Sequence, residues 1–478
     1  MARLEFDERT IQKLFGHEAA EDEDPLRLRE YYFKSSTYDQ VVTDLPVRVL
    51  VGHKGIGKSA LFQNAILEQR DSNNLVIVLK PDDVLDIEKD DADFLRAIRY
   101  WKRGLLQILA NRAAKALGLN ARAVASAIEE GQSILPALAS RIASEGVDNA
   151  TSAQFLKDRH LTTYIDDLDR GWEGRPRDVK RISALLNAVR DLANEESGLR
   201  FRISLRSDVY FLVRTSDEST DKIEGSVIWH SWTNHEIFAL LVKRIETFFG
   251  RNLDYEWLRT RSPNELASYL APVFDDRFRG QGHWRNAPTH RVLMSLIRKR
   301  PRDLVKLCSL SARNARIAKH AKIYTEDLEN SFEEYSQGRV QDTINEYRSE
   351  LPDVERLILN MRPTKKEKTA KAGYVYETAD LLKKIQDITE QGQFRFKLGR
   401  VASKKDLAAF MYKINFLTAR KERSNLIIRK YFEEQRYLQS ELVDFGFNWE
   451  IHPAYRWALQ PDDPNSIYYS LILSSDDG

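Results

Sequence analysis

The chain has 478 residues, of which 42% are hydrophobic and 31% are charged, and its formal net charge is +2. This length predicts two or three domains, and the mixed charges indicate a soluble globular protein. No apolar run reaches the length of a membrane span, so we expect no membrane partner. The single cysteine, Cys308, excludes an internal disulfide and favours a cytoplasmic location.

The charge is unevenly distributed along the chain. Residues 362–436 contain 19 Lys and Arg against 9 Asp and Glu, an excess of ten positive charges on an otherwise acidic body. Such a basic segment is typical of proteins that bind DNA or RNA. It is equally typical of a solvated, lysine-rich helical surface, and both interpretations stay open.

Residues 1–44 are expected to be an irregular or helical lead-in. An apolar strand is predicted at 47–51, and a helix is predicted at 60–67. Between them lies a complete G-x-x-x-x-G-K-S loop, and this strand–loop–helix context is the one that a phosphate-binding loop requires. Its backbone amides and the following helix N-terminus would cradle the phosphates of ATP.

Within this loop, Lys58 is expected to reach the β- and γ-phosphates, and the Ser59 hydroxyl to coordinate Mg²⁺. ATP and Mg²⁺ are therefore the predicted cofactors. The residues expected to bind the nucleotide here are Gly52, His53, Lys54, Gly55, Ile56, Gly57, Lys58, Ser59 and Ala60.

Further buried strands are predicted at 75–79, 161–165, 199–205 and 226–230, with helical segments at 91–145 and 179–193 between them. Strands that alternate with helices indicate a parallel sheet covered by helices. The predicted fold is thus α/β, with a P-loop NTPase core at 45–232. A helical lid is expected at 233–350, and a basic winged-helix-like domain at 351–478.

Two carboxylates follow the strand at 161–165. Asp166 is expected to hold the Mg²⁺ shell, and Asp167 to orient and polarise the attacking water. Arg170 could neutralise Asp169 locally or act on the γ-phosphate of a neighbouring subunit, and the local pair is favoured. Arg206, at the tip of the next strand, is a candidate sensor of the γ-phosphate and equally a surface arginine.

The chain resembles the STAND and KAP groups of AAA-superclass ATPases in the order of its motifs. The phosphate loop comes first, followed by Tyr-Ile-Asp-Asp-Leu-Asp-Arg at 164–170 and Ile-Ser-Leu-Arg at 203–206. The segment 300–304 is similar to the lid-helix motif of those groups, which implies that Pro301 approaches the nucleotide. The resemblance implies an ATP-driven switch whose lid angle changes with the nucleotide. Members of these groups are common in bacterial antiphage and stress-response loci.

The favoured function is therefore an ATPase that drives self-assembly or activates a separate effector protein. A homo-oligomer and such an effector are the expected partners, because no second enzymatic motif is visible in the chain. One alternative is a protein that binds DNA or RNA through 362–436 under the control of ATP. Another is a scaffold that keeps its nucleotide as a structural ligand without hydrolysing it.

Overall fold

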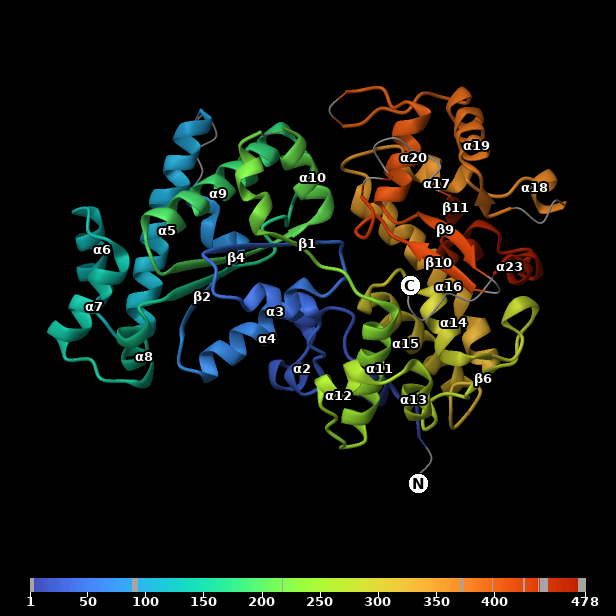
Figure 1. Cartoon of the computed structure of the whole chain (residues 1–478), viewed down its shortest axis with the longest axis horizontal. Helices are drawn as coiled ribbons and strands as arrows, with labels where there is room; N and C mark the ends of the chain where they lie inside the picture. Colours follow the sequence, from blue (N-terminus) through green and yellow to red (C-terminus); the bar gives the residue numbers. More distant parts are fainter. Residues whose placement is uncertain are drawn as a thin grey trace. The chain divides into compact units, whose positions relative to one another are not determined.

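The computed structural model describes residues 4–87, 93–216, 218–369, 373–397, 399–423, 426–436, 438 and 446–471. The chain forms two compact units (Figure 1). The core unit comprises Ser36–Lys54 and Lys58–His230, and the helical unit comprises Met1–Ser35, Gly55–Gly57 and Ser231–Gly478. The tip of the phosphate loop, Gly55–Gly57, therefore groups with the helical unit. The division into four segments expected from the sequence stays a prediction.

A five-stranded parallel sheet is the centre of the core unit, with the strand order β2-β3-β4-β1-β5. All five strands fall where the apolar runs predicted them: β1 Val47–Gly52, β2 Leu75–Leu79, β3 Leu161–Ile165, β4 Leu199–Arg206 and β5 Val227–Trp229. Strand β4 lies between β1 and β3, with Gly52 opposite Arg206 and Ile165 opposite Ile203. The carboxyl ends of β1, β3 and β4 consequently share one edge of the sheet.

Helices cover both faces of this sheet (Figure 1). On one face lie α5 (Phe94–Leu117), α9 (Pro176–Glu195) and α10 (Ser207–Ser216), and on the other lie α3 (Ser36–Val42) and α4 (Lys58–Asp71). Between β2 and β3 the chain also forms η2 (Pro81–Ile87), α6 (Ala121–Glu129), α7 (Ile134–Glu145) and α8 (Ala150–Asp158). The hydrophobic core joins the sheet to α5 and α9. Burial of these apolar faces explains why the strands read as continuous hydrophobic runs.

The helical unit begins with α1 (Glu8–Phe15), η1 (Ala20–Asp22) and α2 (Pro25–Tyr31). It continues after the core with α11 (Asn234–Phe248), α12 (Tyr255–Thr260), α13 (Pro263–Ala267), α14 (Thr289–Leu296), α15 (Pro301–Ile317) and α16 (Thr325–Tyr347). A buried ion cluster ties α15 to α16, because Asp303 accepts hydrogen bonds from Arg298 at 2.7 Å and from Arg339 at 2.7 Å. The start of α15 is thereby held in a fixed position.

The last part of the helical unit contains an antiparallel sheet with the order β10-β9-β11-β8. Its strands are β8 (Val375–Tyr376), β9 (Leu417–Arg423), β10 (Leu426–Lys430) and β11 (Asn448–Ile451). The helices here are α17 (Val354–Asn360), α18 (Lys365–Thr369), α19 (Thr378–Glu390), α20 (Lys404–Lys413), α22 (Arg456–Leu459) and α23 (Pro464–Ser470). The predicted fold class is confirmed: a parallel P-loop core, a helical segment and a winged-helix-like end. Of the helices described, none combines the length and apolarity needed to cross a bilayer.

Candidate nucleotide site

The phosphate loop connects the end of β1 to the start of α4, as the motif predicted. Gly55 and Gly57 have φ angles of 80° and 103°, which side-chain-bearing residues rarely adopt. The ammonium group of Lys58 lies over the loop and donates to the carbonyl oxygens of Gly52 at 2.8 Å and His53 at 3.3 Å. The cation is therefore placed at the centre of the cradle that the loop backbone forms.

The other side chains of the loop differ in how far they are buried. The His53 ring is buried, and its Nδ1 lies 2.9 Å from the Ser207 hydroxyl at the start of α10. Ile56 is buried as well, whereas Lys54 is exposed and Ser59 and Ala60 are half-buried. Because the His53 and Ile56 side chains point into the protein, these two residues can serve a nucleotide only through their backbone.

The loop tip makes its contacts within the helical unit. The indole of Trp232 donates to the Ile56 carbonyl at 2.8 Å, and the backbone N–H of Arg302 donates to the Gly55 carbonyl at 3.3 Å. Pro301 is the first residue of α15, directly before Arg302. The segment 300–304, which the resemblance assigned to the nucleotide, thus meets the loop through the backbone of Arg302. The approach of Pro301 to the nucleotide stays a prediction.

The two predicted carboxylates follow β3 at the shared sheet edge. Asp166 accepts a hydrogen bond from the Ser204 hydroxyl of β4 and one from the Asp167 backbone N–H at 3.0 Å. Asp167 has a φ of 60°, a left-handed conformation in which aspartate is among the tolerated residues. Burial, and secondly the charge of Asp166, raises the pKa of Asp167. A half-exposed carboxylate with a raised pKa is suited to accept a proton from water.

The arginines pair differently from the sequence expectation. Arg170 does pair locally, but its Nε lies 3.6 Å from Asp167, three residues earlier on the same turn, and not beside Asp169. Asp169 instead lies 3.3 Å from the Nε of Arg206, whose guanidinium also donates to both carboxylate oxygens of Asp208. Arg206 is therefore a fixed group at the tip of β4, directly opposite Gly52.

From the sequence, Asp169 was named only as a local partner of Arg170, and Asp208 and His230 were given no role at the site. Asp169 is buried, and this burial raises its pKa to about 6 despite the nearby Arg206. Asp208 holds Arg206 from the start of α10. His230 is fully buried at the end of β5, and burial, followed by the charge of Lys58, lowers its pKa to about 3. A polar residue at the carboxyl end of each strand beside β1 was the available signal for Asp208 and His230.

The residues present fit a magnesium nucleotide. The left-handed glycines and the helix N-terminus of α4 form an anion cradle, and Lys58 supplies a cation above it. Ser59 and Asp166 are oxygen donors of the kind that Mg²⁺ prefers, and they would hold the ion. The bound ion would neutralise charge on the phosphates, while Asp167 would hold the proton-accepting position beside them.

The sheet order, the loop and the paired carboxylates define the class: the core unit has a P-loop NTPase fold. Residues 235–344 match the model of the FunZ-associated C-terminal helical domain. The chain is 23% identical over 230 residues to an 80.3 kDa protein of transposon gamma-delta from Escherichia coli strain K12. That match covers 47% of this chain and 30% of the relative, so the chain spans less than a third of its length.

Several solved structures also match the chain, at low sequence identity and with TM-scores below 0.5. The Aeropyrum pernix ORC2 protein, in its ADPNP–ADP complexes, is 10% identical with a TM-score of 0.38, and 88% of each chain is covered. The Aeropyrum pernix ORC1 protein in complex with DNA is 13% identical with a TM-score of 0.32, covering 92% of this chain and 91% of that one. A RuvB variant from Thermotoga maritima is 10% identical with a TM-score of 0.31, covering 77% and 88%.

Proposed function

We propose that this protein binds ATP with Mg²⁺ and hydrolyses it, and that the nucleotide state controls assembly with itself or with an effector protein. One observation carries the proposal: β4 places the phosphate loop of β1 and the carboxylates of β3 at one edge of the sheet. The Lys58 ammonium lies over the loop, and Asp166 is oriented by Ser204. In this arrangement Asp167 serves as the water-orienting base and Arg206 as the γ-phosphate sensor.

Hydrolysis rates of purified variants test this function. Lys58→Ala removes the cation of the cradle, so ATP binding and hydrolysis should both fall, with turnover lower by about 100-fold or more. Asp167→Asn keeps the shape but cannot accept a proton, so ATP should still bind while kcat falls about 100-fold. The exposed residues of the same unit supply matched controls, Lys157→Ala and Asp148→Asn, which should hydrolyse at the wild-type rate.

Equal rates in the wild type, Lys58→Ala and Asp167→Asn would overturn the ATPase function. Nucleotide released on denaturation of the purified protein then separates the remaining cases. A stoichiometric nucleotide that does not exchange with added ATP would identify the non-hydrolysing scaffold. Its absence, together with unchanged rates, would remove the nucleotide function altogether.

The basic segment 362–436 gives less support to nucleic-acid binding than its composition suggests. Arg420 and Arg429 are buried against Glu450, and Lys384 and Lys413 pair with Glu367 and Glu350. These four cations therefore already have carboxylate partners within the folded chain. A salt titration of DNA and RNA binding would reveal any phosphate contacts, because their number sets the slope of affinity against salt.

The finer biological role rests on motif resemblance alone. The similarity of the loop and of the Asp-Asp-Leu-Asp-Arg motif at 166–170 to STAND and KAP ATPases supports a signalling switch that acts with a separate effector in bacterial antiphage defence. Phage plating on cells that express this chain with its neighbouring genes tests that role. Protection that persists with Lys58→Ala would contradict a nucleotide-driven switch.

A further inference from the structure

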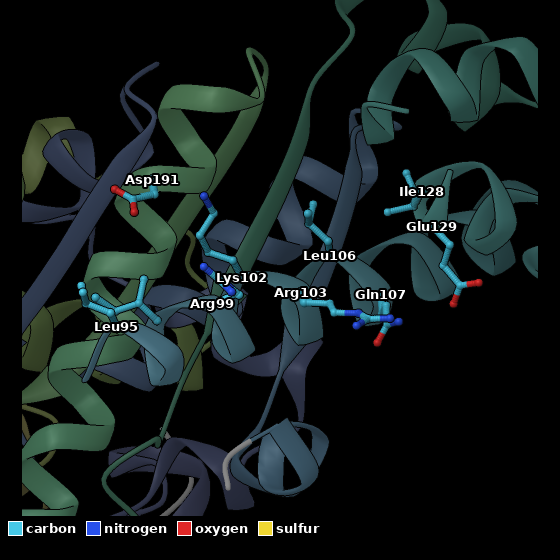
Figure 2. Close-up of a pocket in the computed structure, with 10 residues that line it drawn as sticks. Leu95, Arg99, Lys102, Arg103, Leu106, Gln107, Ile128, Glu129 and Asp191 are labelled. Carbon is cyan, nitrogen blue, oxygen red and sulfur yellow. The ribbon is translucent and has the colours of Figure 1, made fainter. Parts of the chain in front are cut away.

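An open groove runs along the exposed face of α5 in the core unit, away from the phosphate loop. It has a volume of about 590 Å³ and is bordered by α6 and α9. Figure 2 shows the basic side chains of α5 between Asp191 of α9 on one side and Ile128 and Glu129 of α6 on the other. This volume lies in the range of protein sites that bury a ligand or a short segment, about 300–1,000 Å³.

The groove combines exposed apolar surface with unneutralised positive charge. Leu95, in the first turn of α5, is 76% exposed. Arg99 and Arg103 follow it at intervals of one helical turn, so all three line one face. Among the residues that the structure describes, neither arginine has an ion-pair partner, whereas the neighbouring Lys102 pairs with Glu195.

This mixture fits an acidic protein segment better than a nucleic acid. A phosphate backbone could pair with the arginines of the groove, but it has no apolar group to cover Leu95. An acidic segment that carries one exposed aliphatic side chain would satisfy both features. Charge complementarity of this kind sets orientation and partner choice at protein interfaces.

The chain itself contains such a segment in the helical unit. Glu21, Asp22 and Asp24 are exposed, and they are followed by Leu26, which is 67% exposed in the first turn of α2. Asp24 caps α2 by accepting from the Arg27 N–H at 2.9 Å, so the segment is held in a defined conformation. The acidic segment Glu21–Leu26 thus offers negative charge for Arg99 and Arg103 and an exposed leucine for Leu95.

We propose that the groove is a docking site for the acidic segment Glu21–Leu26 of a second copy of this chain. Glu21 and Asp22 pair with Arg99 and Arg103 of the neighbouring molecule, while Leu26 covers Leu95. Because the groove and the segment are different surfaces, the contact is head-to-tail and builds a ring or a filament. The inference deepens the proposed function, on which it rests, by naming the surface through which nucleotide-driven assembly occurs.

Charge reversal on each side tests the contact. Sedimentation velocity of the 478-residue chain with Mg²⁺ and a non-hydrolysable ATP analogue should show oligomers for the wild type. Arg99→Glu with Arg103→Glu should raise the dissociation constant at least about tenfold, and so should Glu21→Lys with Asp22→Lys. Mixing the two double variants should restore assembly, because opposite charges then face each other in every contact.

A charge reversal outside the groove serves as the control. Arg122→Glu with Lys157→Glu reverses two exposed charges of the same unit outside the groove, and this variant should assemble like the wild type. A wild type that stays monomeric at about 100 μM, well above the micromolar range of typical weak contacts, would overturn the inference. Either charge-reversed double variant assembling like the wild type, or a mixture of the two double variants that does not assemble, would also overturn it. A contact between segment and groove whose strength does not depend on protein concentration would do the same, because such a contact lies within one molecule.

ATP hydrolysis measured on the same samples separates this inference from the proposed function. A wild type that hydrolyses ATP but never assembles contradicts the docking site and leaves the ATPase intact. A wild type with no more hydrolysis than Lys58→Ala contradicts the ATPase, whatever its oligomeric state.

Discussion

At the scale of single residues, Asp166 and Asp167 are adjacent in the sequence but have different environments in the candidate site. Asp166 is oriented by hydrogen bonds from Ser204 and from the Asp167 backbone, which suits a constant ligand. Asp167 has a strained left-handed backbone and a raised pKa, which suits a proton acceptor. Position and environment, and not residue type, therefore distinguish the roles that we propose for these two identical side chains.

Asp169 should make stability depend on pH. Burial raises its pKa from 3.8 to about 6, so the folded chain holds this proton more tightly than the unfolded chain does. Ionisation of Asp169 therefore costs stability as the pH rises through this interval, and the cost is complete above the folded pKa. Asp169→Asn has no such cost, so its free energy of unfolding relative to the wild type should increase between pH 5 and pH 8, by on the order of 1 kcal/mol.

Urea unfolding at both pH values measures this difference. Asp148→Asn, at an exposed position of the same unit, is the control and should show no change relative to the wild type between the two pH values. A relative stability of Asp169→Asn that falls from pH 5 to pH 8 would mean that the pair with Arg206 outweighs burial, contrary to the argument.

At the scale of elements, the loop between β1 and α4 depends on backbone conformations that its own glycines allow and on packing that other segments impose. Gly55 has a φ of 80°, and a Cβ built on it would come within 3.0 Å of the Arg302 Cβ. Both the conformation and the close approach therefore require glycine at this position. The motif predicts the first requirement, whereas the second comes from α15, about 250 residues later in the chain.

Gly55→Ala should weaken ATP binding, at least about tenfold, because the loop must shift away from Arg302 to admit the methyl group. Gly118→Ala is a matched control, since Gly118 also has a φ of 80° but a Cβ there would meet nothing within 4 Å. Both variants carry a left-handed strain of about 1 kcal/mol. Titration with a fluorescent ATP analogue, alongside thermal unfolding, should separate them. Equal nucleotide affinity in both variants would show that the contact with Arg302 is unimportant.

At the scale of the whole molecule, local patterns predicted the elements and long-range contacts determined the rest. Each core strand is a short apolar run bounded by polar residues, so all five could be located from the sequence. Their order could not, because it depends on pairing between distant segments. The partners of Arg170 and Arg206 depend on that order and on turn geometry, and the sequence therefore predicted the arginines but not their carboxylates.

The ion-pair partners of the basic segment 362–436 likewise depend on contacts between distant residues, which the sequence does not predict. Its composition counts every lysine and arginine as surface charge, but folding buries two of its arginines, Arg420 and Arg429. Together with Arg456, which follows the segment, they surround one buried carboxylate, Glu450. Arg429 donates to Glu450 at 2.7 Å, and Arg420 lies 3.5 Å away. Burial alone would raise the pKa of Glu450, but the arginines, Arg429 foremost, hold it below its ordinary value.

Glu450→Gln should therefore destabilise the winged-helix-like end of the chain strongly. The neutral side chain leaves three buried cations without their shared anion, and breaking such a buried pair typically costs about 3–5 kcal/mol. Glu422→Gln is the matched control, because Glu422 pairs with Arg420 alone and is 62% exposed, where such a pair contributes about 0–1 kcal/mol. Chemical denaturation followed by tryptophan fluorescence measures the difference, and Trp449 and Trp457, two of the eight tryptophans, are buried next to Glu450 and Arg456 in the sequence. A Glu450→Gln protein as stable as the Glu422→Gln control would show that the three arginines are neutralised by groups other than Glu450.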